Sequence, residues 1–166
     1  HVYLVGLSMG GILSLLMSTK LDVAGVIAMS TPYQISVNYP AWVLRLMSKV
    51  VPYQLKVKGD VGESWFDQDA FTEHISYPKN PIRSAAELQL MLSEMRAALP
   101  LINVPVLLIH SKNDTYVSPE NAERIYASLT TSDKTKVYVT EAGHVVTRDA
   151  ARGEVFEAAK EFILRI

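Results

Sequence analysis

The stretch VYLVGLSMGG, residues 2–11, predicts a short buried strand, a tight turn at Ser8 and the start of a helix. A serine at such a turn has a strained backbone, and Gly6 and Gly10, two residues before and after it, are expected to relieve the crowding. The hydroxyl is then exposed, while unpaired N–H groups and the positive dipole end of the helix stabilise a developing oxyanion. The stretch therefore makes Ser8 a candidate nucleophile on an elbow turn.

A glycine-rich dinucleotide-binding turn is the rival interpretation of the same residues. That fingerprint needs a glycine at the position of Ser8 and an acidic residue about 20 positions further on. The next predicted strand ends in Met29 and Ser30 instead. The sequence disfavours a nucleotide site, and we expect no cofactor.

The composition is typical of one globular domain, with 166 residues, a net charge of −1 and 49% hydrophobic residues. There is no basic stripe, and Lys56 and Lys58 are interpreted as part of a solvated face, so we expect no nucleic-acid partner. No apolar run approaches the roughly 20 residues of a spanning helix, which predicts no stable membrane insertion. Zero cysteines favour a cytoplasmic location, although many secreted bacterial proteins also lack cysteine.

Short apolar runs alternate with helical patterns along the chain. Strands are predicted at residues 2–7, 23–29, 104–110 and 136–140, and helices at residues 10–19, after Ser118-Pro119 and at residues 154–165. The first three strands are apolar on both faces, as a parallel sheet covered by helices requires. This alternation predicts an α/β core made of residues 1–32 and 100–166.

Residues 33–99 form an insert that is too long for a simple crossover between two strands. Helices are predicted at about residues 41–51 and from Ser84 onward, where Ser84 and Glu87 make a capping box. We expect this insert to be a helical cap over the core.

A serine nucleophile needs a base and a third group that orients the base. His144 follows the last predicted strand, at the sheet edge where ligands bind in open α/β sheets, and is the candidate base. His110 lies inside an apolar strand, which favours a core histidine. Asp114 follows the third strand at the same edge and is the candidate acid, although an isolated aspartate there would equally suit a plain turn. The order Ser8, Asp114, His144 is the one expected of α/β-hydrolases.

At these residues the sequence resembles the α/β-hydrolases, and among them the small bacterial carboxylesterase and monoacylglycerol lipase group. The resemblance rests on GLSMGG, on HSKNDTYVSPENAERIY and on EAGHVVTRD, and it covers the whole chain. It implies that Ser8 is the nucleophile, His144 the general base and then acid, and Asp114 the orienting carboxylate. It further implies that the Met9 backbone N–H is one oxyanion donor and that residues 33–99 are the cap.

The resemblance also sets an expectation for the sheet. The family fold has eight strands, with the elbow after the fifth and a second oxyanion donor from a loop after the third, and neither that loop nor an earlier strand is found in this chain. A strand that is apolar on both faces should pair on both edges, and residues 1–7 have too few partners here. We therefore expect the carboxyl-terminal half of an α/β-hydrolase fold, with parallel strands 5 to 8, flanking helices and a helical cap insert, and with about 80–100 residues preceding it.

The expected reaction is hydrolysis of a small-molecule carboxylic ester or lipid through an acyl-enzyme, with no metal. With the resemblance, the apolar residues Trp42, Met91 and Met95 of the insert suggest a pocket for an acyl chain, although each could equally pack the cap on itself. An acyltransferase or thioesterase would keep the same triad, and a noncatalytic ligand-binding relative would usually have lost a member of it. The oligomeric state is left open.

Overall fold

Four parallel strands form the central sheet of the protein. The computed structural model describes residues 1–35, 39–55 and 65–165, so the predicted solvated pair Lys56 and Lys58 lies outside the described residues. Along the sheet the order is β1-β2-β5-β6, and every neighbouring pair is parallel. The strands are β1 (Tyr3–Leu7), β2 (Gly25–Met29), β5 (Val106–Ser111) and β6 (Lys134–Val139). The prediction of an α/β fold with four parallel strands is confirmed.

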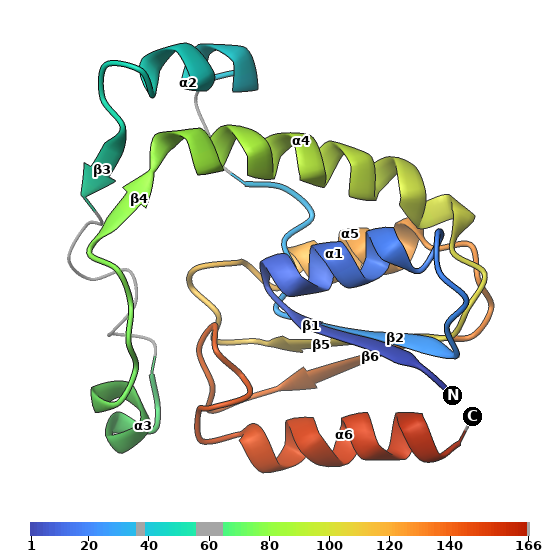
Figure 1. The fold of residues 1–166 in the computed structure, drawn as a ribbon. Helices are drawn as coiled ribbons and strands as arrows, with labels where there is room; N and C mark the ends of the chain where they lie inside the picture. The colour runs from blue at the N-terminus through green and yellow to red at the C-terminus, as the bar shows by residue number, and fades with distance from the viewer. Residues whose placement is uncertain (36–38, 56–64, 166) are drawn as a thin grey trace.

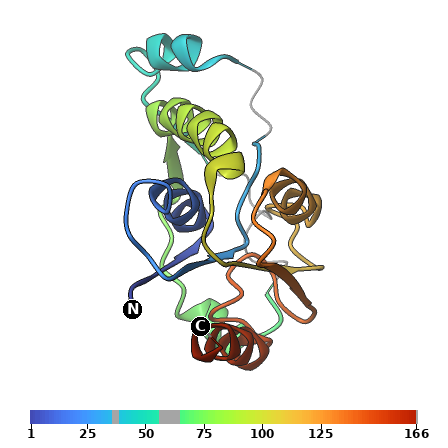
Figure 2. The ribbon, with the colours of Figure 1, turned by 90° about the vertical axis from the view of Figure 1, so that its right-hand side faces the viewer.

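Helices cover both faces of this sheet, as Figures 1 and 2 show. The helices α1 (Met9–Met17) and α5 (Glu120–Ser128) lie on one face, and α6 (Arg152–Leu164) lies on the other. All residues of β2 and β5 are buried, and their side chains alternate between two apolar clusters, one on each face. The two-sided hydrophobicity of these strands therefore has its expected cause, because each face packs against a helical layer.

The elbow strand β1 lies at one edge of the sheet. It pairs with β2 from Tyr3 opposite Gly25 to Leu7 opposite Met29. The side chain of Val5 is 52% exposed. The described sheet thus leaves part of an apolar strand open to solvent.

The insert of residues 33–99, which the sequence predicts to be a cap and which is named the cap insert below, is built of small elements before one long helix. They are α2 (Ala41–Met47), β3 (Tyr53–Leu55), α3 (Gln68–Thr72), β4 (Lys79–Pro81) and α4 (Ile82–Ala98), and a short 3-10 turn, Leu99–Leu101, follows them. The strands β3 and β4 make an antiparallel pair, which the sequence analysis did not predict. Their residues are exposed on both faces, so they carry no alternation of apolar and polar residues that would mark a strand.

Helix α4 joins the cap insert to the core. Leu92, Met95 and Leu99 are fully buried in the same apolar cluster as Ile12 of α1. Figures 1 and 2 show α4 running alongside α1, on the side away from the sheet, with α2 outside α4. The last helix of the insert is therefore part of the core packing. Neither α4, with 17 residues, nor any other helix in the described ranges is both long and apolar enough to cross a membrane.

Helix α4 begins at Ile82, three residues before the first helical position expected from a capping box with Ser84 as its N-cap. Pro81 is its N-cap residue, and the N–H of Ile82 donates to the carbonyl of Pro52 at 3.0 Å. The start is displaced because β4 runs directly into the helix and the chain at Pro52 supplies an acceptor that a local sequence pattern does not reveal. Glu87 instead binds Arg45 of α2, with its two carboxylate oxygens 2.7 Å and 3.1 Å from the guanidinium.

Candidate active site

Ser8 forms a strained turn between β1 and α1. Its backbone has φ 56° and ψ −116°, a conformation uncommon outside glycine, with a cost on the order of 1–3 kcal/mol. Its N–H donates to the carbonyl of Met29 at 2.8 Å, and its own carbonyl accepts the N–H of Gly11 at 3.0 Å. These bonds tie the turn to β2 and α1. The strand, turn and helix predicted for residues 2–11 are confirmed.

The glycines around Ser8 differ in what they permit, which corrects the symmetric role expected for them. A Cβ on Gly6 would lie 2.1 Å from the backbone carbonyl oxygen of Gly10, so this site accepts only glycine. A Cβ on Gly10 would meet nothing within 4 Å. Gly11 is the second crowded position, because a Cβ there would lie 1.9 Å from the hydroxyl of Thr31. Gly6 therefore permits the close approach of β1 to α1, and Gly11 permits the close approach of α1 to Thr31, two residues after the end of β2.

His144 lies in the loop between β6 and α6, and its ring reaches both partners expected for it. Nε2 is 2.9 Å from the hydroxyl oxygen of Ser8, and Nδ1 is 2.8 Å from Oδ2 of Asp114. The Tyr116 ring lies beside the imidazole, with 5.0 Å between ring centroids. An ionised Asp114 accepts a hydrogen bond from the Nδ1–H group of His144, which leaves the Nε2 lone pair free to accept the hydrogen bond from Ser8.

Asp114 is held in the loop after β5 as a buried, ionised carboxylate. The residue is 4% exposed, and Oδ1 accepts the N–H groups of Tyr116 at 2.9 Å and Val117 at 2.8 Å. Burial alone would raise the pKa of Asp114, but hydrogen bonds from His110 and His144 outweigh it and hold this pKa well below its ordinary value. The turn expected as the alternative role of Asp114 is present, and the same carboxylate also reaches the imidazole.

Two residues at the end of β5, His110 and Ser111, support the site through contacts that the sequence analysis did not predict. His110 is 1% exposed, as expected for a core histidine, but its Nε2 is 2.8 Å from the carbonyl of Val117 and 3.4 Å from Oδ2 of Asp114. The hydroxyl of Ser111, the last residue of β5, donates to the carbonyl of Ala142 and so joins β5 to the loop between β6 and α6, which is named the histidine loop below. In the sequence, the only local indication of the contact between His110 and Asp114 was that the two residues are four positions apart.

The remaining candidate site residues lie in different surroundings. Met9 begins α1 directly after Ser8, so its N–H is in the first helical turn, where N–H groups lack an intrahelical acceptor. Met95 is fully buried in the core cluster, Met91 packs partly buried against that cluster, and the side chain of Trp42 is 69% exposed. The contacts among the described residues place none of Trp42, Met91 and Met95 against the triad, and their role in binding stays a prediction. In the described ranges, no group of three or more His, Cys, Asp or Glu residues could hold a metal ion.

Two curated proteins are similar to this chain over nearly its whole length. It is 26% identical to a carboxylesterase of Bacillus subtilis (strain 168), with 97% of this chain and 63% of that protein covered. It is also 26% identical to the thermostable monoacylglycerol lipase of Bacillus sp. (strain H-257), with 99% of this chain and 63% of that protein covered. The chain therefore spans somewhat less than two thirds of the length of these relatives.

Solved structures share the fold, and residues 1–151 match a family. A structure from a study of the metagenome-derived lipolytic enzymes LipS and LipT has a TM-score of 0.83 at 22% identity, covering 100% of this chain and 66% of that one. The monoacylglycerol lipase of Paleococcus ferrophilus has a TM-score of 0.77 at 21% identity, covering 95% and 65%. The matched family is described as serine aminopeptidase, S33, or Hydrolase_4. The chain belongs to this family of α/β-hydrolases.

Proposed function

We propose that this chain carries the catalytic triad of a carboxylic ester hydrolase that works through an acyl-enzyme on Ser8. One observation carries the proposal: the continuous chain of hydrogen bonds from Ser8 through His144 to Asp114, at 2.9 Å and 2.8 Å. The three residues follow three different strands and are brought together only by the fold. Such a chain of nucleophile, base and orienting carboxylate is the arrangement that activates a serine hydroxyl.

The reaction would proceed in two matched halves. Ser8 Oγ attacks the ester carbonyl carbon while His144 Nε2 takes the hydroxyl proton, and Asp114 stabilises the imidazolium. The resulting oxyanion lies near the Met9 N–H at the positive end of α1. His144 then gives the proton to the departing alcohol, which leaves an acyl group on Ser8. Water then attacks the acyl carbon while His144 takes its proton, and His144 returns this proton to Ser8 Oγ as the bond between Ser8 and the acyl group breaks and the carboxylic acid departs.

The substrate class follows from the relatives and from the cap. Two similar proteins are named a carboxylesterase and a monoacylglycerol lipase, and the cap insert is rich in apolar side chains. We therefore propose a medium-chain ester or a monoacylglycerol as substrate, with the acyl chain between cap and core. Neither substrate requires a cofactor, since the triad supplies the nucleophile and the proton transfers.

The test combines covalent labelling with turnover in the intact protein. A fluorophosphonate probe is expected to label Ser8, and Ser8→Ala is expected to lose both labelling and hydrolysis of a p-nitrophenyl ester. Ser128→Ala is the matched control, because its side chain is partly exposed at the end of α5 and its hydroxyl donates only to the carbonyl of Arg124 among the described contacts. This control is expected to keep the parent rate.

The substrate panel distinguishes the proposal from other acyl-transfer reactions. Esters with acyl chains of increasing length, a monoacylglycerol and an aminoacyl anilide are assayed with the same protein. Hydrolysis of the esters supports the proposal. Turnover of the anilide without ester hydrolysis, or full ester hydrolysis by the Ser8→Ala protein, would contradict it.

A further inference from the structure

Asp149 is a buried carboxylate that the proposed reaction does not use. It lies five residues after His144, in the turn before α6, and is 1% exposed. Burying a carboxylate away from water is costly unless its oxygens receive hydrogen bonds. Because Asp149 lies beside the histidine loop, its hydrogen-bond donors show which parts of the chain this carboxylate holds together.

Two separate parts of the chain donate to the two oxygens of Asp149. Oδ2 accepts the N–H of Gly143, the residue before His144, at 2.7 Å. Oδ1 accepts the N–H groups of Phe66 at 2.9 Å and Asp67 at 2.8 Å, and that of Ala150 at 2.8 Å. One oxygen therefore faces the histidine loop and the other faces the cap insert.

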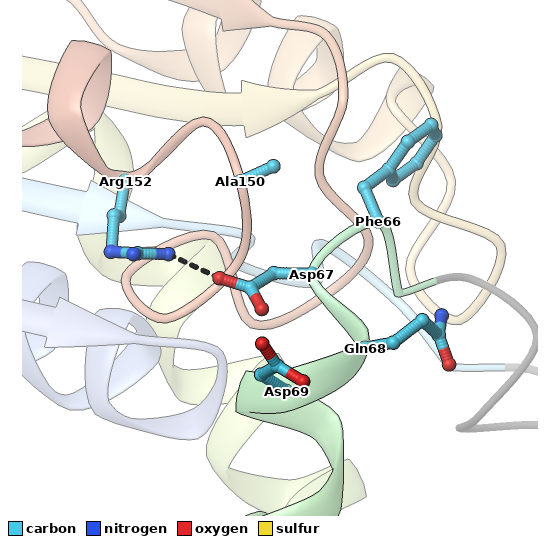
Figure 3. Close-up of a pocket in the computed structure, with 6 residues that line it drawn as sticks. All are labelled: Phe66, Asp67, Gln68, Asp69, Ala150 and Arg152. Carbon is cyan, nitrogen blue, oxygen red and sulfur yellow. Dashed lines mark hydrogen bonds and ion pairs between the residues drawn. The ribbon is translucent and has the colours of Figure 1, made fainter.

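A second contact, an ion pair near the surface, also holds residues 66–67 of the cap insert. Asp67 accepts a hydrogen bond from Ala70 at the start of α3, and its other oxygen is 2.6 Å from the guanidinium of Arg152. Asp67 and Arg152 line an open pocket of about 500 Å³, and Figure 3 shows the pair among the residues that line it. Trp65, directly before the segment, is 5% exposed and packs against the rings of Phe71 and His74.

We propose that Asp149 is a positioning residue that acts on both sides of the active site. Through Oδ2 it orients the peptide of Gly143, and with it the attachment of His144, so that the imidazole reaches Ser8. Through Oδ1 it seats cap residues 66–67 against that loop. The proposal rests on the proposed ester hydrolysis for its readout, and it adds a link between the cap and the catalytic base.

Because both carboxylate oxygens of Asp149 accept hydrogen bonds, replacement by asparagine can break the bond on one side and keep the bonds on the other. A carboxylate accepts on both oxygens, whereas an amide has one accepting oxygen and one NH₂ group that only donates. With its oxygen toward the cap, the new amide in Asp149→Asn would keep the bonds to Phe66, Asp67 and Ala150 but place NH₂ against the N–H of Gly143. Asp149→Asn is therefore expected to disturb the histidine loop and to keep the hydrogen bonds that hold cap residues 66–67. Asp149→Ala removes the hydrogen bonds on both sides.

Steady-state kinetics and tryptophan fluorescence separate these effects in the intact protein. All variants are compared in a Trp42→Phe background, in which Trp65 is the tryptophan of the chain that reports on the cap segment. For Asp149→Asn we expect kcat on p-nitrophenyl acetate to fall on the order of 10- to 100-fold, with KM within about twofold and Trp65 emission unchanged. For Asp149→Ala we expect the same loss and a red-shifted Trp65 emission. Arg152→Gln removes the outer ion pair with Asp67 and the hydrogen bonds from the guanidinium to the carbonyls of Arg148 and Asp149, but it leaves the N–H donors of the Asp149 carboxylate in place, so kcat is expected to stay within about twofold.

Each outcome decides the proposal. Parent-like kcat in Asp149→Asn would overturn it, and so would a red shift of Trp65 in Asp149→Asn that accompanies the loss of activity, because that result indicates general unfolding. Hydrogen exchange in the unsubstituted protein gives an independent reading: the amides of Gly143 and Phe66 are expected to be protected, and fast exchange at either would refute the contacts. A parent protein that neither hydrolyses the ester nor reacts with fluorophosphonate refutes the proposed function instead, and exchange and Trp65 emission then still test Asp149.

Discussion

Replacing Gly6 and Gly10 separately by alanine tests how the elbow at Ser8 is built. The two glycines occupy symmetric positions in the sequence, but a new Cβ would lie 2.1 Å from the Gly10 carbonyl oxygen at Gly6 and would meet nothing within 4 Å at Gly10. Real Cβ atoms essentially never come within 3.0 Å of such an atom, so in Gly6→Ala the backbone of β1 and α1 must separate by about 1 Å. We expect one substitution to be damaging and the other to be tolerated.

The size of the effect follows from this displacement. Forcing extra atoms into a packed core costs about 1–3 kcal/mol of unfolding free energy, which in a chain of this size lowers Tm by about 2–4 °C per kcal/mol. Because the displaced segment carries Ser8, a misplacement of about 1 Å is expected to reduce the rate on the order of 10²-fold. Gly10→Ala is expected to raise the unfolding free energy by up to about 1 kcal/mol, since alanine has less conformational freedom to lose in a helix.

Thermal unfolding and the rate of p-nitrophenyl ester hydrolysis check both variants in the intact protein. The expected result is a lower Tm and a rate loss for Gly6→Ala, beside an equal or higher Tm and a rate within about tenfold of the parent for Gly10→Ala. Parent-like Tm and activity in Gly6→Ala would refute the argument. Equal damage in the two variants would do the same, because it would show that Gly10 is as crowded as Gly6.

Two further predictions concern stability. Asp114→Asn is expected to lower the unfolding free energy most near pH 6 and progressively less below about pH 4. The reason is that the pKa of Asp114 is lowered in the folded chain, so the stabilising effect of the carboxylate is present above the unfolded pKa and is lost as the pH falls. Urea titrations at each pH measure this dependence. A deficit that grows with acid would contradict this. Met95→Ala, at a fully buried site, is expected to cost about 2–5 kcal/mol, and Trp42→Ala, at an exposed one, within about 0.5 kcal/mol. Equal losses in urea unfolding would refute the core placement of Met95.

The positions of Ser8, Asp114 and His144 were predictable because of a geometric property of parallel sheets. The carboxyl ends of the strands meet at one edge, so polar residues that directly follow successive buried strands come close together. The strands themselves were recognisable because β2 and β5 are apolar on both faces. These inferences needed only local patterns and the direction of the strands.

The supporting contacts were not predictable in this way, because they join residues that are far apart in the chain. Asp149 receives N–H groups from Phe66 and Asp67, more than 80 residues earlier, and backbone donors leave no mark in the residue types. Met95 belongs to an apolar stripe along helix α4, and the spacing of such a stripe in the sequence does not tell whether it faces a substrate or α1. The different roles of Gly6 and Gly10 likewise depend on how closely the strand and the helix approach each other.

The histidine loop is held from three sides, and this arrangement explains how a loop can keep the proposed base, His144, in a fixed position. Loops are usually the less rigid parts of a fold, whereas a general base must stay within hydrogen-bond reach of the proton it takes. Ala142 accepts from Ser111, Gly143 donates to Asp149, and His144 itself binds Asp114, so three consecutive residues are each fixed by a different partner. Two of these partners belong to β5 and its following loop, and the third also binds the cap. Displacing the cap segment therefore weakens only one of the three attachments, and its effect should appear as a lower rate before it appears as a loss of the fold.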